Sequence, residues 1–145
     1  MPTPNPNHVT ATLGPTGFTT TIVAGNHALT ADEPIPVGGA DKGPDPYGLL
    51  LASLGACKAM TLRMYADRKQ WPLTGVTVAL SHEHVHTKDC EECETDDGHV
   101  LKVRAELTLE GDLDPDQRAR LAEIADRCPV HRSLSGEVII TSSLA

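Results

Sequence analysis

The hydrophobic positions of this chain change their spacing several times, and each spacing predicts a different element. Residues 9–13, 18–23 and 27–31 are short, rich in threonine and β-branched residues, and separated by Gly-Pro-Thr-Gly and Gly-Asn turns. Such segments predict a meander of antiparallel strands. The next stretch, residues 32–43, is rich in proline and glycine and predicts a loop.

The longest apolar run predicts a helix from about residue 46 to about residue 69. Asp45 can cap its first turn, and Pro46 occupies a position where the missing N–H costs nothing. Trp71-Pro72 ends it, and polarity rises only from Arg63. Because its first two thirds are apolar almost all round, we expect a central buried helix rather than a surface helix.

Alternation of apolar and polar positions returns after this helix. Residues 73–86 and 100–110 predict two long strands on either side of a polar, acidic excursion. Asp114-Pro115-Asp116-Gln117 predicts a capped helix that ends at Cys128, and residues 137–142 predict a last strand. This order of elements predicts an α+β fold in a single domain over residues 1–145.

Composition and charge narrow the class of protein. At 145 residues, 39% hydrophobic and 22% charged, the chain reads as globular, and its net charge of -8 argues against nucleic acid or an anionic membrane as the main partner. Residues 47–59 are too short and interrupted to span a bilayer, and the first residues lack the pattern of a signal peptide. We therefore expect a cytoplasmic protein, in which four cysteines favour catalysis or metal binding over structural disulfides.

Two cysteines, Cys57 and Cys128, fall on the apolar sides of the two predicted helices, about seventy residues apart. Each could be a small core hydrophobe, or the two could form a redox centre if the fold brings them together. At the end of its helix, Cys128 would have its thiol pKa raised by the helix dipole. The residues alone leave both interpretations open.

Residues 43–57, which end in Gly-Ala-Cys, together with the downstream Cys128-Pro129-Val130-His131-Arg132, resemble the OsmC/Ohr family, and within it the OsmC-like branch. The resemblance implies an OsmC-like fold, with antiparallel sheets around a long central helix and two subunits intertwined as a homodimer. It also implies a cofactor-free thiol peroxidase of oxidative-stress defence that reduces organic hydroperoxides and is regenerated by a dithiol. By this resemblance Cys57 would be the peroxidatic and Cys128 the resolving cysteine. The apolar substrate pocket would be lined by neighbours on the same helix: Tyr47, Leu50, Leu54 and Met60.

The chain departs from the family pattern at the groups that activate the thiolate. The family uses an arginine from the N-terminal strands and a glutamate upstream of the cysteine, but no arginine precedes Arg63 and Tyr47 stands at the glutamate position. We expect His131 or Arg132 to supply the positive charge, and Lys58, rotated by about 100° from Cys57, to point away. The alternative is a non-catalytic module that binds an apolar or thiol-reactive ligand between subunits.

The acidic excursion carries a second set of soft ligands. His82, His84 and His86 alternate along the predicted strand and lead into Cys90 and Cys93. Three interpretations stay open: a solvated strand extension, a zinc site of two imidazoles and two thiolates, or a surface dithiol that relays electrons to Cys57 and Cys128. Our predicted site includes no metal.

Overall fold

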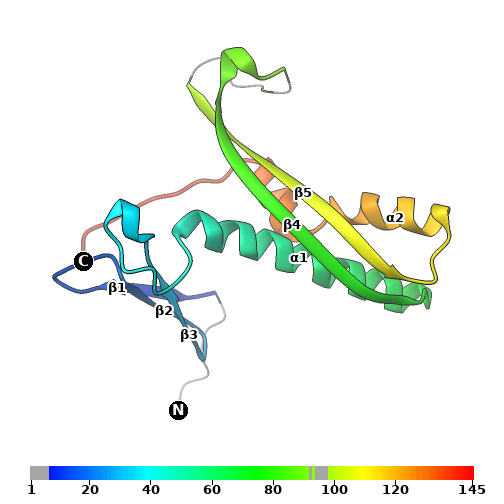
Figure 1. Cartoon of the computed structure of the whole chain (residues 1–145), viewed down its shortest axis with the longest axis horizontal. Coiled ribbons are helices and arrows are strands. Elements are labelled where there is room, and N and C mark those ends of the chain that lie inside the picture. The colour runs from blue at the N-terminus through cyan, green and yellow to red at the C-terminus, as the bar shows by residue number, and fades with distance from the viewer. Residues whose placement is uncertain (1–6, 92, 94–97) are drawn as a thin grey trace. The chain divides into compact units, whose positions relative to one another are not determined.

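The computed structural model describes residues 7–91, 93 and 98–145 and divides into two compact units, Met1–Ala52 and Ser53–Ala145 (Figure 1). The boundary falls inside the long helix α1 (Pro46–Lys69), so each unit is described by itself. The single domain over residues 1–145 stays a prediction. Among the described residues, no helix combines the length and apolar character that a membrane span requires.

The first unit contains the predicted meander. Strands β1 (Val9–Leu13), β2 (Thr20–Ala24) and β3 (His27–Ala31) form an antiparallel sheet in the order β1-β2-β3. The tight turn at Gly25-Asn26 brings Ala24 opposite His27, and Gly25 has a positive φ of 61°, which glycine adopts without steric cost. The second strand begins two residues later than predicted.

The loop after β3 is organised by Asp32, whose residue is only 2% exposed. Its carboxylate accepts hydrogen bonds from the Thr19 hydroxyl at 2.8 Å and from the Glu33 N–H at 2.8 Å. It also accepts from the N–H groups of Ala40 and Lys42. Burial raises the pKa of this carboxyl, but the four hydrogen bonds outweigh burial and hold the pKa below its ordinary value.

Helix α1 begins and ends where the sequence predicts. Asp45 caps it, since its Oδ1 accepts a hydrogen bond from the Gly48 N–H at 2.7 Å. In the second unit one stripe of buried positions recurs every four residues, at Leu54, Lys58, Leu62 and Ala66, and Gly55 beside Leu54 is buried too. The opposite face is open to solvent and includes Ala56, Met60 and Met64. The expectation of burial all round is therefore wrong for the single chain, because the chain covers only one face of the helix.

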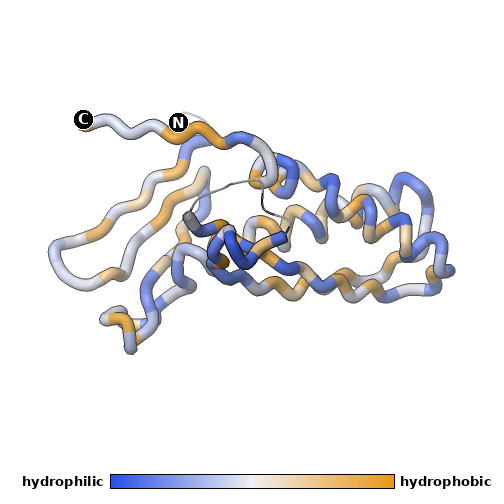
Figure 2. The backbone as a smooth tube through the Cα atoms, turned by 90° about the horizontal axis from the view of Figure 1, so that it is seen from above, coloured by the Kyte–Doolittle hydropathy of each residue, from blue (hydrophilic) through white to orange (hydrophobic). Residues whose placement is uncertain are grey.

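The second unit is built on a long antiparallel hairpin of β4 (Leu73–His86) and β5 (His99–Gly111) (Figure 1). Its ladder runs from Leu73 opposite Gly111 to His86 opposite His99. The predicted alternation is confirmed in the first half of β4, where Val76, Val78 and Leu80 are half-buried and the residues between them are exposed. Figure 2 shows the corresponding mixture of hydrophobic and hydrophilic positions along the β4–β5 hairpin.

Helices α2 (Pro115–Ala125) and α3 (Pro129–Ser135) follow the hairpin. The predicted capping box at the start of α2 is present, with Asp114 and Gln117 each accepting from the other's backbone N–H. α1, β4 and α2 share one core, made of Leu62, Ala66, Leu73, Leu113, Leu121, Ile124 and Ala125. α1 also lies close to β4, because a Cβ on Gly55 would stand 2.7 Å from Leu80 Cδ1.

Two predicted elements differ from the structure near the C-terminus. α2 ends at Ala125 rather than at Cys128, and Cys128 instead precedes the first residue of α3. Pro129 explains the break, since a residue before proline is pushed out of the helical region, and Cys128 has φ -63° and ψ 145°.

The strand predicted over residues 137–142 is wrong. In the described C-terminal segment these residues form neither helix nor strand, and Val138, Ile139 and Ile140 are 55%, 81% and 82% exposed. A run of β-branched residues forms a strand only if another strand offers hydrogen-bonding partners. In the described chain the two sheets are made of β1–β3 and β4–β5.

Candidate functional site

The fold brings Cys57 and Cys128 together. Cys57 lies half-buried on α1, Cys128 lies fully buried at the start of α3, and both are free cysteines. The two thiols lie close enough for Cys57 to raise the pKa of Cys128. The fold therefore places side by side two thiols that are about seventy residues apart in the sequence.

The environment of Cys128 favours the neutral thiol. Burial raises its pKa, and the contact with Cys57 raises it further. The His131 N–H, 3.4 Å from Sγ, and the charge of Lys58 act in the opposite direction without cancelling the rise. The predicted direction is correct, but burial causes it and not the end of a helix.

Lys58 is the unexpected member of the site. Its residue is only 2% exposed. Its Nζ lies 3.0 Å from the carbonyl oxygen of Ala125, 3.3 Å from Asp126 Oδ1 and 2.7 Å from His131 Nδ1. The expectation that Lys58 points away is wrong, because residue 58 falls on the buried stripe of α1 and its long side chain reaches the corner between α2 and α3.

This contact also fixes the state of His131. An ammonium group has three N–H donors and no acceptor, so Nδ1 of His131 accepts a hydrogen bond from Lys58 and carries no proton. From this network we assign Nδ1 as the acceptor in the contact with Lys58. The carboxylate of Asp126, whose side chain is 72% exposed, is the anion that faces the ammonium.

The two predicted activation candidates occupy different positions. His131 acts on Cys128 through its backbone N–H. Arg132 is exposed on α3, and it is not one of the described groups that shift the Cys128 pKa. Sequence reasoning missed Lys58 and Asp126, although a lysine within an otherwise apolar helical run was a visible signal.

The four predicted pocket residues do not share one environment. Leu54 is buried and Met60 is 63% exposed, on different faces of α1. Tyr47 and Leu50 belong to the first unit, where Tyr47 is 41% exposed and Leu50 is half-buried. A role for these residues in substrate binding stays a prediction.

A surface cavity of about 310 Å³ lies elsewhere on the second unit, lined in part by Met64, Tyr65, Arg120 and Ile124. The Arg120 Nε donates a hydrogen bond to the Tyr65 hydroxyl oxygen at 3.1 Å, and this contact lowers the pKa of Tyr65. Three cations, Arg68, Lys69 and Arg120, surround the Tyr65 ring. Sequence reasoning did not find this cluster.

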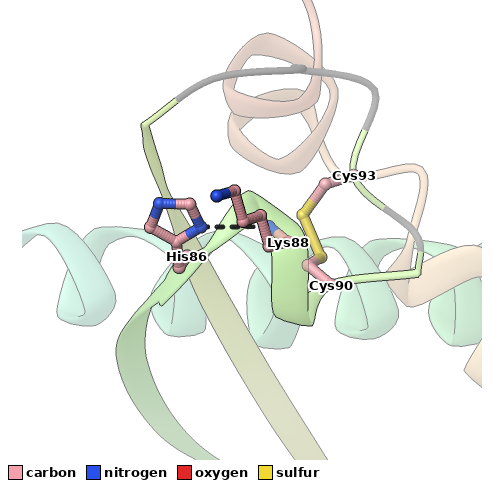
Figure 3. The surroundings of a disulfide bond; sticks show 4 residues. All are labelled: His86, Lys88, Cys90 and Cys93. Atoms are coloured by element: carbon pink, nitrogen blue, oxygen red, sulfur yellow. Dashed lines mark hydrogen bonds between the residues drawn. A yellow bond between two sulfur atoms is a disulfide. The ribbon is translucent and has the colours of Figure 1, made fainter.

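The other cysteine pair is oxidised. Cys90 and Cys93 form a disulfide beyond the end of β4, close to His86 and Lys88 (Figure 3). Bonded to each other, the two sulfurs are not thiolate ligands for zinc, and the described residues contain no group of three or more His, Cys, Asp and Glu placed to hold a metal.

The predicted histidine row is present on the hairpin. The His82 and His84 rings lie edge to face with centroids 6.2 Å apart, and His86 faces His99 across the ladder at 5.1 Å. His86 Nδ1 accepts a hydrogen bond from the Lys88 N–H.

Comparison with known proteins identifies the family to which this chain belongs. A family model described as OsmC-like protein matches residues 39–143, a span that contains all four cysteines. The chain belongs to the OsmC-like protein family. The strands β1–β3 of this OsmC-like protein precede the matched span.

Solved structures show the same fold. The OsmC-like protein of Mycoplasma pneumoniae has a TM-score of 0.71 at 20% identity, covering 89% of this chain and 86% of that one. An organic hydroperoxide resistance protein OsmC of Legionella pneumophila has a TM-score of 0.62 at 21% identity, with 89% and 88% covered. The organic hydroperoxide resistance protein OhrB of Bacillus subtilis has a TM-score of 0.60 at 20% identity, with 89% and 90% covered.

No curated protein matches the sequence. At these identities the structural likeness concerns the fold, and it confirms the predicted α+β, OsmC-like architecture of antiparallel sheets and helices.

Proposed function

We propose that this OsmC-like protein is a thiol-dependent peroxidase that reduces organic hydroperoxides through Cys57 and Cys128 in oxidative-stress defence. The observation that carries the proposal is the meeting of these two thiols from distant parts of the chain. A half-buried thiol can be reached by a substrate, whereas Cys128 is fully enclosed. We therefore assign Cys57 as the peroxidatic and Cys128 as the resolving cysteine.

The reaction has three balanced steps. The Cys57 thiolate attacks the outer oxygen of the hydroperoxide, the O–O bond breaks, and the alkoxide takes a proton from water and leaves as an alcohol while Cys57 becomes a sulfenic acid. The Cys128 thiol then displaces the hydroxyl group, which takes the thiol proton and leaves as water, and a Cys57–Cys128 disulfide forms. A dithiol reduces this disulfide by exchange and is itself oxidised.

The family supports the choice of substrate class. Some solved proteins of this fold are named organic hydroperoxide resistance proteins. An organic hydroperoxide also suits a cysteine that lies on a largely apolar helix, where Tyr47, Leu50, Leu54 and Met60 remain our candidates for the pocket. A cytoplasmic location would supply the reducing conditions that regeneration needs.

A homodimer belongs to the same proposal. The open face of α1, with Ala56, Met60 and Met64, and the exposed Val138–Ile140 segment are apolar surfaces that a second copy would cover. Sedimentation should find a dimer at micromolar concentration, and a stable monomer would reject this part.

The experiment on the wild type is direct. One equivalent of cumene hydroperoxide should convert the two free thiols into a Cys57–Cys128 disulfide, identified by mass spectrometry of the peptides. In Cys128→Ser, Cys57 should instead be trapped as a sulfenic acid that excess oxidant converts to sulfinic acid. Peroxide consumption that leaves Cys57 reduced would reject the assignment.

The second candidate function is a non-catalytic module that binds an apolar or thiol-reactive ligand between subunits. The absence of any arginine before Arg63, and Tyr47 at the glutamate position, favour it. It predicts that the protein binds such a ligand while the rate of peroxide consumption stays at the uncatalysed level.

A further inference from the structure

The Cys90–Cys93 disulfide lies in a loop whose two ends are already held together by backbone hydrogen bonds. The β4–β5 ladder continues to His86 opposite His99, and one step further the Thr87 N–H donates a hydrogen bond to the Gly98 carbonyl at 3.1 Å. The bridge joins residues only three apart inside that loop. The stabilisation from a disulfide grows with the length of chain that it closes. This short bridge therefore adds little to the free energy of unfolding.

The surroundings of the bridge suit thiol–disulfide exchange better than a structural role. Both cysteine residues are half-buried rather than enclosed, so a thiol can reach the sulfurs. His86 and Lys88 precede the bridge along the chain and are drawn near it in Figure 3, where the Lys88 backbone N–H donates a hydrogen bond to His86 Nδ1. The C-x-x-C spacing is the one in which thiol pKa values are lowered in exchange centres.

The sequence around the bridge is strongly acidic. Residues 88–98 contain six Asp or Glu residues and one lysine. Negative charge repels an anionic thiol and attracts a cationic one, most strongly at low salt.

We propose that Cys90 and Cys93 form a second redox centre, an exchangeable disulfide that takes two electrons from a neutral or cationic thiol reductant. The thiolate of the reductant attacks one sulfur and forms a mixed disulfide, while the other sulfur leaves and takes up a proton. A second thiol of the reductant then displaces the protein sulfur. The protein gains two thiols and the reductant becomes a disulfide.

The test uses the full-length native protein and the differential alkylation of each cysteine, followed by peptide mass spectrometry. Dithiothreitol should open the bridge without denaturant, and after its removal the linear disulfide cystamine should close the bridge again. Cys90→Ser is the matched control, because its remaining Cys93 thiol cannot form the bridge. A bridge that opens only after unfolding, or that never re-forms, would overturn the proposal.

The choice of reductant is tested separately at equal thiolate concentrations. Cationic cysteamine should open the bridge several-fold faster than anionic glutathione, and added salt should reduce the difference. Equal rates at low salt would overturn the charge preference.

A different observation, the buried ammonium group of Lys58, carries a second inference, which rests on the proposed function. All three of its N–H donors are used by Ala125, Asp126 and His131, so it makes no further hydrogen bond to a thiolate. Its charge nevertheless reaches the site, because it favours the ionised form of Cys128.

We infer that Lys58 is the positioning residue that replaces the missing family arginine. It holds the α2–α3 corner against α1 and supplies the net positive charge beside the two thiols, and Asp126 partly neutralises that charge. His131 links the two groups, since its ring contacts this ammonium and its backbone N–H donates to Cys128 Sγ.

The test is the rate at which iodoacetamide alkylates Cys57 in the reduced protein across pH 6 to 9, which requires no peroxide. Lys58→Met removes the cation and should slow alkylation and shift its profile to higher pH. Asp126→Asn leaves the cation less neutralised and should speed alkylation and shift the profile to lower pH. A purely structural role for this cluster would not give shifts of opposite sign.

Two further variants make the result decisive. Arg127→Met removes an exposed cation next to Cys128 and should leave the profile unchanged, whereas Arg132→Met tests the rival cation. If Lys58→Met is unstable, the Asp126→Asn shift alone decides, because Asp126 is exposed and its replacement is isosteric. Unshifted profiles for Asp126→Asn, or a slowing by Arg132→Met, would overturn the inference, whatever the peroxidase assay shows.

Discussion

The two cysteine pairs of this chain are opposite in almost every physical respect. Cys57 and Cys128 come from distant segments, meet as free thiols and lie next to a buried lysine. Cys90 and Cys93 lie three residues apart, are bonded, and belong to an acidic, half-buried loop. The second pair is visible in the sequence as a motif, while the first exists only because the chain folds. Short spacing therefore identifies a pair, but only burial and charge indicate the chemistry that each pair can perform.

The largest expected difference between the two cysteine pairs is in the rate of peroxide consumption. Cys57→Ser should reduce the consumption of cumene hydroperoxide to the uncatalysed rate, since it removes the nucleophile. Cys90→Ser with Cys93→Ser should leave the first turnover intact, because neither sulfur takes part in that step. The measurement is a single-turnover assay with a stoichiometric amount of peroxide. The reverse pattern would move the peroxide chemistry to the hairpin.

The burial of Cys128 should give the next largest difference, which is in the rate of alkylation. In the fully reduced native protein, alkylation of Cys128 should be about a hundredfold slower or more than that of Cys90, because Cys128 reacts only when the structure opens. A pulse of iodoacetamide followed by peptide mass spectrometry measures both rates. Mild denaturant should remove the difference, and similar native rates would contradict the enclosure of Cys128.

Removal of the bridge should have a modest effect on stability. For a loop this short, the chain-entropy relation gives at most about 2 kcal/mol for Cys90→Ala with Cys93→Ala. Urea unfolding of the oxidised wild type and of the double variant measures this difference. A loss well above that value would indicate a structural bridge and weaken the case for an exchange centre.

The smallest effect concerns pH and the raised pKa of Cys128. An unfolded thiol ionises above pH ~8.5, whereas the folded thiol keeps its proton to higher pH, so the folded state then binds more protons than the unfolded state. The free energy of unfolding should therefore fall as pH rises above that value, by at most about 1.4 kcal/mol per pH unit. Below it this contribution is constant. Cys128→Ala should flatten the fall, and an unchanged slope in this variant would contradict the assignment.

The sequence predicts the elements best where local signals agree. Asp45 and the Asp114–Gln117 box define the starts of α1 and α2, and strict alternation defines β4, because caps and periodicity are properties of neighbouring residues. The prediction fails for residues 137–142, since a run of β-branched residues cannot show whether a partner strand exists.

The site is predicted less completely for the same reason. Both cysteines could be named from the resemblance, but the angle between neighbouring helical residues predicted that Lys58 points away from Cys57. That angle ignores the reach of a four-carbon side chain and the position of the α2–α3 corner, which only the fold determines.

The length of the β4–β5 ladder has a kinetic consequence for these two centres. Gly55, two residues before Cys57, lies level with Leu80, and six further positions lead to His86, roughly 20 Å along the strand at ~3.3 Å per residue. Sulfur atoms that exchange must come into bonding contact, so within one chain the bridge and the buried pair do not react directly. Any transfer of electrons between them requires a second molecule, such as a diffusing thiol or another copy of the chain. Its rate should therefore depend on the concentration of that molecule, and in a dilute sample the two centres should equilibrate with the solution independently.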